Sequence, residues 1–402
     1  MKINNYVILG SGIIGLTIAQ NIISKEPSSK IHIVDKENEP GLHASGRNSG
    51  VVHSGIYYPT NSLKSKISSR SRVLFKNFLK NNNINFNDHG KLILPTNIAQ
   101  EEYLSILTKR ADDLDLNYQY IKRNNIRNIE RFANNSFDAI YIKDTLVCKP
   151  IEVVKCLYDV LRRNKNVFFY FNSHISSFDT HTKSIYIESK LINFDFLVNS
   201  TGSFADIEAT KLGHKHNYKL IPFKGIYWEV NKNQEFYVKG NIYPVPDPSF
   251  PFLGVHFTTD PYGNTYIGPT SIPAFGRENY SIFPDLLKSE SWVILYYLSR
   301  LYSKNKFNFR FLAHSEFKKY FKKYFFNDAR KLVLNFNSSM MTSSYKVGIR
   351  PQLIDKNKFE LINDFKIEIQ DKNIIHILNA ISPAFTCSFG LAEYIYDKYI
   401  SQ

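Results

Sequence analysis

Residues 5–35 of this chain, NYVILGSGIIGLTIAQNIISKEPSSKIHIVD, predict its fold. Residues 5–9 form an apolar run typical of a buried strand, 13–23 have the apolar spacing of a helix, and 31–34 form a second apolar strand. A strand, a helix and a strand in this order make a βαβ unit with parallel strands. The sequence therefore predicts an α/β protein that begins with such a unit.

The turn of this unit reads GSGIIG. Its first glycine allows the tight turn, its second lets backbone N–H groups approach a pyrophosphate, and its third lets helix and strand pack closely. Asp35 follows the second strand, where a carboxylate accepts hydrogen bonds from ribose hydroxyls; the alternative is an ordinary turn residue. The residues expected to contact a dinucleotide in this unit are Gly10, Gly12, Ile13, Ile14, Gly15, Asp35 and Lys36.

Composition indicates a globular chain of two intertwined domains, because 402 residues exceed the roughly 100 to 200 of one ordinary domain. A content of 43% hydrophobic and 22% charged residues excludes a disordered chain. The formal charge of +15 raises nucleic acid as a partner, but Lys and Arg are scattered rather than clustered. We therefore expect a solvated basic surface that attracts anionic substrates, and no nucleic-acid partner.

The cysteines and the apolar segments indicate the compartment. Cys148, Cys156 and Cys387 are too few and too dispersed for a disulfide framework or a metal site, so a reducing cytoplasm is expected and no metal is. Glycines interrupt the N-terminal apolar run, which therefore does not read as a secretory signal. No stretch supplies the roughly 20 apolar residues of a membrane span. We expect a soluble chain, at most peripheral at the inner face of the membrane.

The remaining sequence alternates helices and strands. The expected helices are 62–80, 98–113, 150–163, 285–302, 314–325 and 391–400. The expected strands are 90–95, 167–171, 185–187, 194–198 and 374–378. Residues 219–268 alternate short strands with Pro, Gly, Asn and Asp turns, which is typical of an antiparallel sheet.

Several motifs resemble one family of flavoenzymes. They are LHASGRNSGVVHSGIYYP at 42–59, SLKSK at 62–66, GKLIL at 90–94, PFKG at 222–225, NIYPVPDPSFPFLGVHFT at 241–258, GIRPQ at 348–352 and LNAISPAFTCSFGLAEYI at 378–395. Together they resemble the D-amino-acid-oxidase-like enzymes, and within them most closely the L-2-hydroxyglutarate oxidase/dehydrogenase family. The resemblance covers nearly the whole chain in order.

The resemblance implies an α/β fold in which a discontinuous Rossmann domain of the glutathione-reductase type binds FAD and joins an antiparallel-sheet substrate domain. We assign 1–80, 146–215 and 345–402 to the FAD domain, and 81–145 and 216–344 to the substrate domain. The further residues implied in FAD binding are Ser45, Gly46, Arg47, Asn48, Ser49, Gly50, Val51, Thr201, Gly202, Gly348, Arg350, Ser382, Pro383, Ala384, Phe385 and Thr386. Bound FAD is expected to be noncovalent, with His43 and Cys387 as the open candidates for a covalent link.

Two histidines and one arginine are the candidates for catalysis. Oxidation of a secondary alcohol needs a base for the hydroxyl proton while a hydride leaves to the flavin, and an imidazole suits that task. We expect His53 or His256 to be this base and the other to orient the hydroxyl, the alternative for each being a packing histidine, as expected for His376. The resemblance gives Arg350 the clamp on the substrate carboxylate, for which a guanidinium fork is suited; the alternative is a surface salt bridge.

The substrate pocket is expected to include Tyr57, Tyr58, Lys224 and Tyr243. The chain lacks the arginine that the family usually has after GVHFT, and it has Gly276 where a lysine is usual. A second substrate carboxylate would therefore have fewer cationic partners, unless Lys224 or Arg277 reaches it.

The substrate class expected is a small carboxylate, an L-2-hydroxyglutarate-like 2-hydroxy acid that is oxidised to the 2-oxo acid. An amine or amino-acid oxidase resembling glycine or sarcosine oxidases is the main alternative, and a flavin-free binding or tRNA-modifying protein is the third. Because no second glycine-rich fingerprint appears, no NAD(P) domain is expected. Oxygen, or a quinone or electron-transfer chain, is then the acceptor.

Overall fold

The N-terminal βαβ unit lies in a six-stranded sheet. The structure is a computed structural model that describes residues 3–401 except 180, 232–234, 247–252 and 282–288. The strand order is β21 (Lys366–Gln370), β22 (Ile374–Asn379), β13 (Phe196–Asn199), β1 (Asn5–Leu9), β2 (Lys30–Val34) and β9 (Val167–Tyr170). All neighbours pair in parallel except β21, which is antiparallel to β22. Segments from both ends and from the middle of the chain therefore build one sheet.

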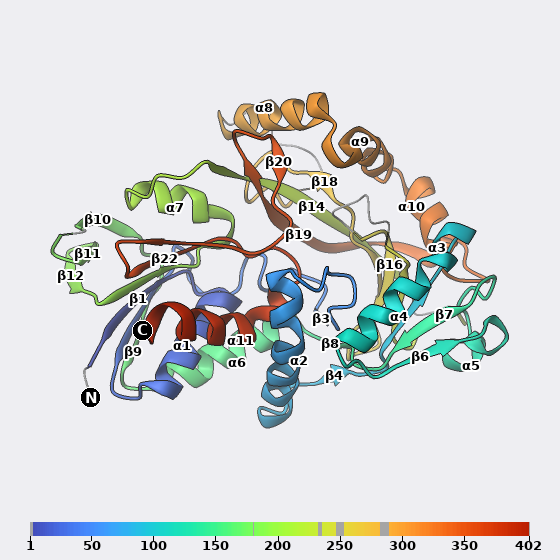
Figure 1. The fold of residues 1–402 in the computed structure, drawn as a ribbon, viewed down its shortest axis with the longest axis horizontal. Coiled ribbons are helices and arrows are strands. Elements are labelled where there is room, and N and C mark those ends of the chain that lie inside the picture. The colour runs from blue at the N-terminus through green and yellow to red at the C-terminus, as the bar shows by residue number, and fades with distance from the viewer. Residues whose placement is uncertain (1–2, 180, 232–234, 247–252, 282–288, 402) are drawn as a thin grey trace.

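Alternation along β1 assigns its side chains to two cores. Tyr6 and Ile8 pack in the core formed with α1 (Ile13–Lys25), α2 (Leu63–Asn81), α6 (Pro150–Arg162) and α11 (Ala384–Ile395). Val7 and Leu9 pack on the other face, against a small antiparallel sheet of β10 (Ile175–Asp179), β11 (Ser184–Ile187) and β12 (Lys190–Asn193). Figure 1 shows α1, α6 and α11 along one face of the sheet and α7 (Ala205–Lys211) over the other.

The second large sheet has ten strands and is built around two long ones. Strands β14 (Tyr218–Val230) and β19 (Met341–Asp355) pair antiparallel along most of their length. The sheet continues from β14 through β17 (Thr265–Gly268), β16 (His256–Thr259), β15 (Asn241–Pro244), β5 (Lys91–Leu94), β7 (Ala139–Ile142) and β6 (Tyr118–Ile121). Strand β20 (Glu360–Leu361) flanks β19, and β18 (Ile272–Pro273) pairs with β14. Among the described strands of this sheet, only β15 and β5 pair in parallel, so the predicted antiparallel sheet is present.

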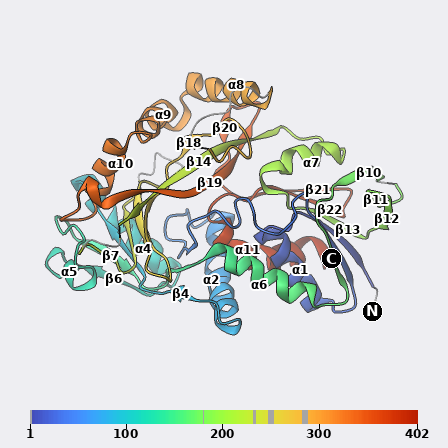
Figure 2. The same ribbon diagram turned by 180° about the vertical axis from the view of Figure 1, so that it is seen from behind.

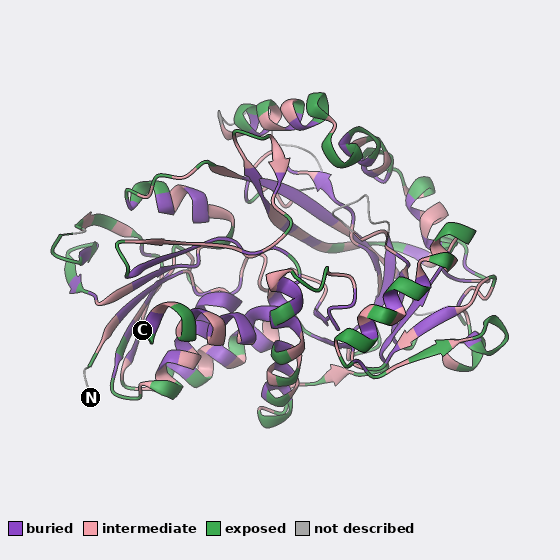
Figure 3. Cartoon of the chain, viewed as in Figure 1, coloured by how far each residue is buried: buried purple, intermediate pink, exposed green. Residues whose placement is uncertain are grey.

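Helices cover this sheet on both sides. Phe325 of α10 (Lys322–Ala329) packs with Phe257, and Ile221 of β14 packs with α8 (Ser289–Lys304) and α9 (Phe309–Lys318). Helix α4 (Leu104–Asp113) packs on Ile93 and Ile140 from the other face. Figure 2 shows α8, α9 and α10 following the outer side of the sheet, and Figure 3 shows that their outward surfaces are exposed while β14 and β17 to β15 are buried.

Short elements complete the fold. Helices α3 (Ile98–Glu102) and α5 (Ile126–Ile129) flank the far strands of the second sheet. Strands β3 (Val51–Val52), β8 (Leu146–Cys148) and β4 (Phe86–Asn87) form a three-stranded sheet. Strand β3 comes from the 42–59 motif, so this small sheet holds that motif in place. Among the described residues, no helix is long and apolar enough to cross a membrane.

Three expected boundaries were wrong. The helix expected over 314–325 is broken, because Phe321 is extended (φ −92°, ψ 124°) between α9 and α10. Helix α11 begins at Ala384, seven residues before the expected start, because the chain turns into a helix directly after Pro383. Strand β19 pairs with β14 from Met341 to Asp355, so residues 345–355 lie in the second sheet rather than with the FAD domain. Residues 285–288 of another expected helix lie outside the described residues.

Candidate active site

One cavity of about 470 Å³ collects most of the residues singled out in the sequence. It extends from the start of α1 to the face of the ten-stranded sheet that carries Tyr243 and His256. The predicted residues that line it are Gly12, Ile13, Ile14, Ser45, Arg47, Asn48, Ser49, Val51, His53, Tyr57, Tyr58, Gly202, Tyr243, His256, Gly348, Arg350, Ser382, Pro383, Ala384, Phe385 and Thr386. Both sheets and the 42–59 motif therefore contribute to a single site.

The start of α1 forms one end of the cavity and suits a pyrophosphate. The N-cap residue Gly12 has no side chain, the Ile13 N–H donates to Ser45 Oγ at 2.9 Å, and no acidic residue lies in the first turn. Backbone N–H groups at a helix start attract anions. A Cβ built on Gly12 would lie 2.9 Å from Ser45 Oγ, so a side chain here would enter the cavity wall. Gly10 has φ +95°, and its Cβ would lie 2.8 Å from the Ser200 carbonyl oxygen, so the turn requires glycine.

Asp35 and Lys36 do not line the cavity. The Asp35 carboxylate accepts hydrogen bonds from Ser11 N at 2.7 Å and Ser11 Oγ at 2.6 Å, so it holds the glycine turn from behind. The Lys36 ammonium forms ion pairs with Glu37 and, at 2.5 Å, with Glu278. These two carboxylates and His43 lie close enough to ligate a metal, but Lys36 already supplies the cation there. The Lys36 ammonium is therefore paired with two carboxylates away from the cavity, and a contact of Lys36 with the cofactor stays a prediction.

Other predicted cofactor residues shape the backbone behind the cavity. Those that do not line it are Gly10, Gly15, Gly46, Gly50 and Thr201. A Cβ at Gly50 would lie 1.9 Å from the Cys148 carbonyl oxygen, and one at Gly15 would lie 2.0 Å from the Gly10 carbonyl oxygen. The Thr201 hydroxyl donates to Asn199 at 2.7 Å. These residues set the path of the loops whose neighbours face the cavity.

The start of α11 forms a second positive end at the cavity. Pro383 is its N-cap, with no side-chain cap and no acidic residue in the first turn. The cavity thus receives two helix starts, which suits a ligand that carries negative charge at two places, as reduced FAD does at its pyrophosphate and its flavin ring. Cys387 is buried and, like His43, does not line the cavity. The residues present therefore fit FAD, and its noncovalent binding stays a prediction.

His256 presents one basic ring nitrogen. Its Nδ1 lies 2.8 Å from the Gly254 carbonyl oxygen, so Nδ1 carries the proton and Nε2 keeps its lone pair. The ring stacks on Tyr243 with centroids 3.8 Å apart. Burial, together with the charges of Lys91 and Arg350, lowers the pKa of His256 to about 3, against the opposing effect of its hydrogen bond to Gly254. His256 is therefore neutral at ordinary pH and able to accept a proton.

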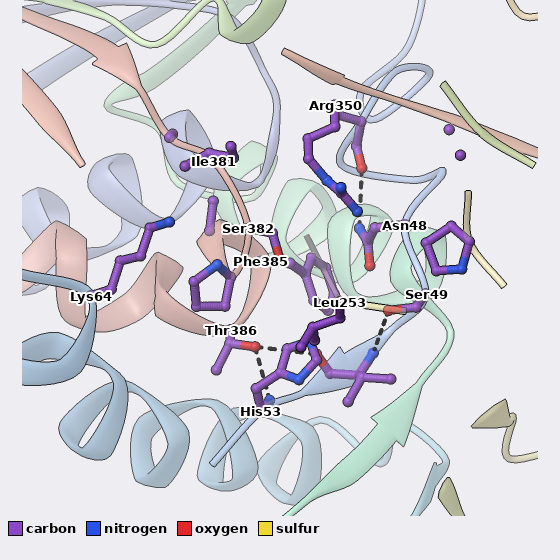
Figure 4. Close-up of a pocket in the computed structure, with 18 of the residues that line it drawn as sticks. Asn48, Ser49, His53, Lys64, Leu253, Arg350, Ile381, Ser382, Phe385 and Thr386 are labelled. Atoms are coloured by element: carbon purple, nitrogen blue, oxygen red, sulfur yellow. Dashed lines mark hydrogen bonds between the residues drawn. The ribbon is translucent and has the colours of Figure 1, made fainter. Parts of the chain in front are cut away.

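His53 lies beside the same tyrosine. Its backbone N–H donates to Thr386 Oγ1 at 3.0 Å, which ties the loop after β3 to the start of α11 (Figure 4). Its ring approaches Tyr243 edge-on at 6.3 Å, and its Nδ1 is buried without a hydrogen-bond partner in the described structure. Burial lowers the pKa of His53 well below its usual value. His376, in contrast, bonds to Gln370 and stacks on His214, the packing role expected for it.

Arg350 enters the cavity from β19. Figure 4 shows it apart from His53, on the other side of the lining residues. Its Nη1 donates to Ser271 Oγ at 3.0 Å, and burial lowers the pKa of its guanidinium. A buried guanidinium that faces a cavity is suited to a planar anion such as a carboxylate.

Lys224 and Arg277 point elsewhere. Neighbouring residues of a strand face opposite sides, so Lys224 points away from the cavity that Gly225 lines. The Lys224 ammonium donates to Asn279 at 2.8 Å and to the Ser281 carbonyl. Arg277 is 2% exposed and pairs with Asp206 and Glu290, both at 2.6 Å. The predicted substrate contact of Lys224 was wrong, and Arg277 does not reach the cavity.

Two buried lysines were missed. Lys64 of the SLKSK motif lines the cavity and extends toward the segment of Ile381 and Ser382 (Figure 4); burial lowers its pKa to about 8. Lys91 opens β5 in GKLIL, is fully buried, and has a pKa that burial lowers to about 7. For Lys91, the sequence did contain a signal of a functional role, because a lysine within an apolar strand carries a charge that is costly to bury.

Comparisons with known proteins agree with this site. Residues 5–398 match the family described as FAD dependent oxidoreductase. An FAD-bound L-alpha-glycerophosphate oxidase of Mycoplasma pneumoniae has a TM-score of 0.74 at 19% identity, covering 98% of this chain and 94% of that one. Glycine oxidase from Geobacillus kaustophilus has a TM-score of 0.69 at 13% identity, with 98% and 94% covered. The chain belongs to the FAD dependent oxidoreductases, and the predicted fold class and cofactor are confirmed.

The sequence relatives define a narrower group. L-2-hydroxyglutarate dehydrogenase of Indibacter alkaliphilus is 32% identical over 393 residues, 96% of each chain. The mitochondrial L-2-hydroxyglutarate dehydrogenase of Bos taurus is 28% identical over 423 residues, 98% of this chain and 88% of the relative. The enzyme of that name from Escherichia coli K12 is 27% identical over 404 residues, with 98% and 92% covered. Within the oxidoreductases, the chain belongs to the L-2-hydroxyglutarate dehydrogenase family.

Proposed function

We propose that this protein oxidises a small 2-hydroxy acid, with L-2-hydroxyglutarate as the leading candidate, to the corresponding 2-oxo acid. The observation that carries the proposal is the meeting of His53, His256 and Arg350 at one cavity that also receives the starts of α1 and α11. It is supported by relatives named L-2-hydroxyglutarate dehydrogenase that match nearly the full chain.

In the proposed reaction, Arg350, His256 and His53 each have one task. Arg350 holds the carboxylate next to the reacting carbon, and His256 Nε2 accepts the proton of the hydroxyl on that carbon. His53 orients the hydroxyl through its buried, unpartnered ring nitrogen. FAD, when bound, supplies the ring that accepts the hydride from the same carbon. Loss of one proton and one hydride converts the alcohol to the ketone.

Other residues of the chain hold the cofactor in this scheme. The start of α1 at Gly12 holds the pyrophosphate, and the segment from Ser45 to Val51 borders the flavin. The start of α11 and the ammonium of Lys64 line the same cavity and would stabilise negative charge on the reduced ring. The domain division expected from the sequence, with the boundary before β19 moved to residue 341, is part of this proposal, and FAD would bind at the cavity to which both sheets contribute.

Reoxidation completes the proposal. Oxygen, or a quinone or electron-transfer chain, is the proposed acceptor. Peripheral association with the inner face of a membrane would give access to a quinone, and the formal charge of +15 would favour an anionic lipid surface.

Anaerobic additions to the yellow holoprotein test the substrate class. L-2-hydroxyglutarate is expected to bleach the flavin absorbance, with slower bleaching by L-lactate and L-malate and none by D-2-hydroxyglutarate. Glycine, sarcosine and glycerol 3-phosphate belong in the same panel. Bleaching by the amines alone would overturn the proposal in favour of an amine oxidase of the same fold.

Arg350→Lys is expected to lower kcat/KM for the hydroxy acid by roughly 30-fold. The lysine keeps the charge but loses the two-pronged fork, so the carboxylate is held less accurately relative to the flavin and His256. Stopped-flow flavin reduction and steady-state kinetics measure the effect. Arg70→Lys is the matched control, because Arg70 forms a two-pronged but exposed pair with Glu393. Equal kinetics for wild type and Arg350→Lys would show that the arginine is structural.

A further inference from the structure

Lys91 is a buried cation that the proposed mechanism does not use. Its side chain is fully buried, and its ammonium makes no hydrogen bond and no ion pair within the part of the chain that the structure describes. Taking an ammonium out of water costs several kcal/mol unless an anion or hydrogen bonds compensate it. Apart from two aromatic rings, the described surroundings of Lys91 therefore supply no group that compensates its charge.

Two tyrosines separate Lys91 from the cavity. Its Nζ lies 4.2 Å from the ring centroid of Tyr57 and 5.3 Å from that of Tyr243, and both rings line the cavity. The two rings stack with centroids 6.4 Å apart. The Tyr57 hydroxyl is buried and makes no hydrogen bond in the described structure, and the buried Tyr243 hydroxyl has Thr258 as its polar neighbour.

The sheet register explains this arrangement. Lys91 on β5 pairs with Asn241 on β15, and Ile93 pairs with Tyr243. Residues two apart on a strand share a face, so Lys91 and Tyr243 belong to the same face of the sheet. Tyr57 reaches this face from the 42–59 motif. Three segments far apart in the sequence thus bring an ammonium and two phenol hydroxyls to one wall of the cavity.

We propose that the Tyr57 and Tyr243 hydroxyls, with the charge of Lys91 behind them, form the subsite for a second carboxylate of the substrate. The enzyme would then select 2-hydroxy dicarboxylic acids over monocarboxylic ones. A carboxylate accepts hydrogen bonds from both hydroxyls and compensates the buried ammonium, so the three groups are satisfied together.

Other cations of the site do not take this place. Lys224 and Arg277 are bonded away from the cavity, and Arg350 is assigned to the carboxylate at the reacting carbon. Arg110 lines the cavity, and its Nη1 donates to the Tyr57 carbonyl at 3.3 Å. Arg47 also lines the cavity, but its Nε donates to the Leu42 carbonyl at 2.7 Å, and Lys64 is assigned to the reduced flavin ring. Among the described residues, Arg110 is therefore the competing candidate that the experiment must separate from Lys91. The chain lacks the arginine and the lysine that the family usually has, and the sequence therefore argued against a diacid. Lys91 nevertheless supplies the pocket with a cation.

The inference rests on the proposed oxidation of a 2-hydroxy acid, and its test compares two substrates that differ only at the far end. L-2-hydroxyglutarate and L-2-hydroxypentanoate have the same chain, with a methyl group in place of the second carboxylate. In Lys91→Met holoprotein, kcat/KM for the diacid is expected to fall by about 30-fold or more relative to that for the monoacid, the size expected for losing a partner of a buried charge. Methionine fills the space of the lysine stem, so folding is expected to persist, and thermal unfolding checks this.

Three further variants sharpen the result. Tyr57→Phe and Tyr243→Phe remove only a hydroxyl, and each should lower the preference for the diacid several-fold. Lys346→Met is the matched control, because Lys346 is also a lysine in this sheet whose Nζ lies over two tyrosine rings, at 4.4 Å from Tyr266 and 5.2 Å from Tyr227. Of these two rings only that of Tyr227 lines the cavity, and among the described residues neither has a buried hydroxyl without a hydrogen-bond partner. The control should keep the wild-type preference.

Binding of oxidised holoprotein to glutarate and to pentanoate separates this inference from the proposed function. Neither acid carries a 2-hydroxyl, so the shift in flavin absorbance on titration reports the subsite even if no hydroxy acid reduces the flavin. Tighter binding of glutarate that Lys91→Met abolishes supports the subsite. Equal loss for both acids, no loss for either, or loss of the preference in Arg110→Met but not in Lys91→Met would overturn it.

Discussion

A Gly12→Val variant is expected to purify as folded protein without FAD. A Cβ at Gly12 would lie 2.9 Å from Ser45 Oγ, and the two further methyl groups of valine would project into the space at the start of α1. This is where backbone N–H groups are expected to approach the pyrophosphate. The FAD content per chain, measured from the absorbance spectrum after removal of free flavin, is expected to fall from near one to near zero.

Two variants serve as controls for this loss. Gly12→Ala adds only the Cβ, and a rotation of the Ser45 hydroxyl relieves part of the contact, so an intermediate FAD affinity is expected. Gly276→Ala lies outside the cavity and has its nearest neighbour atom at 3.6 Å, so it should bind FAD like the wild type. Full occupancy of Gly12→Val by FAD, with unchanged affinity, would remove this turn from the cofactor site.

His256→Asn is expected to slow flavin reduction by the substrate between about 100-fold and 10,000-fold, the range for loss of a positioned general base. Asparagine is still able to bond to the Gly254 carbonyl but has no basic nitrogen to replace Nε2. FAD binding should be unchanged, since the residues assigned to the cofactor are untouched. Anaerobic stopped-flow measurement of the flavin absorbance gives the rate.

His376→Asn is the matched control for the base. His376 is also buried and also has a pKa that burial lowers to about 3, but it bonds to Gln370 behind the six-stranded sheet. Its replacement should affect stability more than rate. If His53→Asn slows flavin reduction and His256→Asn does not, His53 is the base and His256 orients the hydroxyl. If neither variant slows flavin reduction, neither histidine acts in catalysis.

The pH dependence of the wild type follows from the direction in which the pKa of His256 is shifted. The pKa of His256 is lowered, so its basic form is present above the folded pKa of about 3 and is lost only below it. No fall in kcat/KM from this group is therefore expected as the pH is lowered through 6.5. A fall centred near pH 6.5 would show a solvated imidazole instead.

Local patterns in the sequence were sufficient for most of the elements and, together with the family resemblance, for the cofactor. The GSGIIG turn, the apolar runs around it and the 42–59 motif predicted the βαβ unit, FAD and the residues that meet at the cavity. The boundaries of α11 and β19 failed because Ser382–Thr386 has no apolar periodicity that marks a helix start, and because the pairing of β14 with β19 joins segments over 100 residues apart. Local patterns carry no information on such pairings.

The sequence by itself determined the class of chemistry for this protein. Its glycines are spaced as a close approach of the backbone to a ligand requires. This spacing, and the motifs with the histidines and the arginine, were readable without a structure. The tertiary structure decided which cations face the cavity. Lys224 of the PFKG motif points away from the cavity, because neighbouring residues of a strand face opposite sides. Lys91 of the apolar strand β5 lies behind Tyr57 and Tyr243, which line the cavity. Which side chains share one wall depends on strand pairing and register, because these bring distant segments of the chain together.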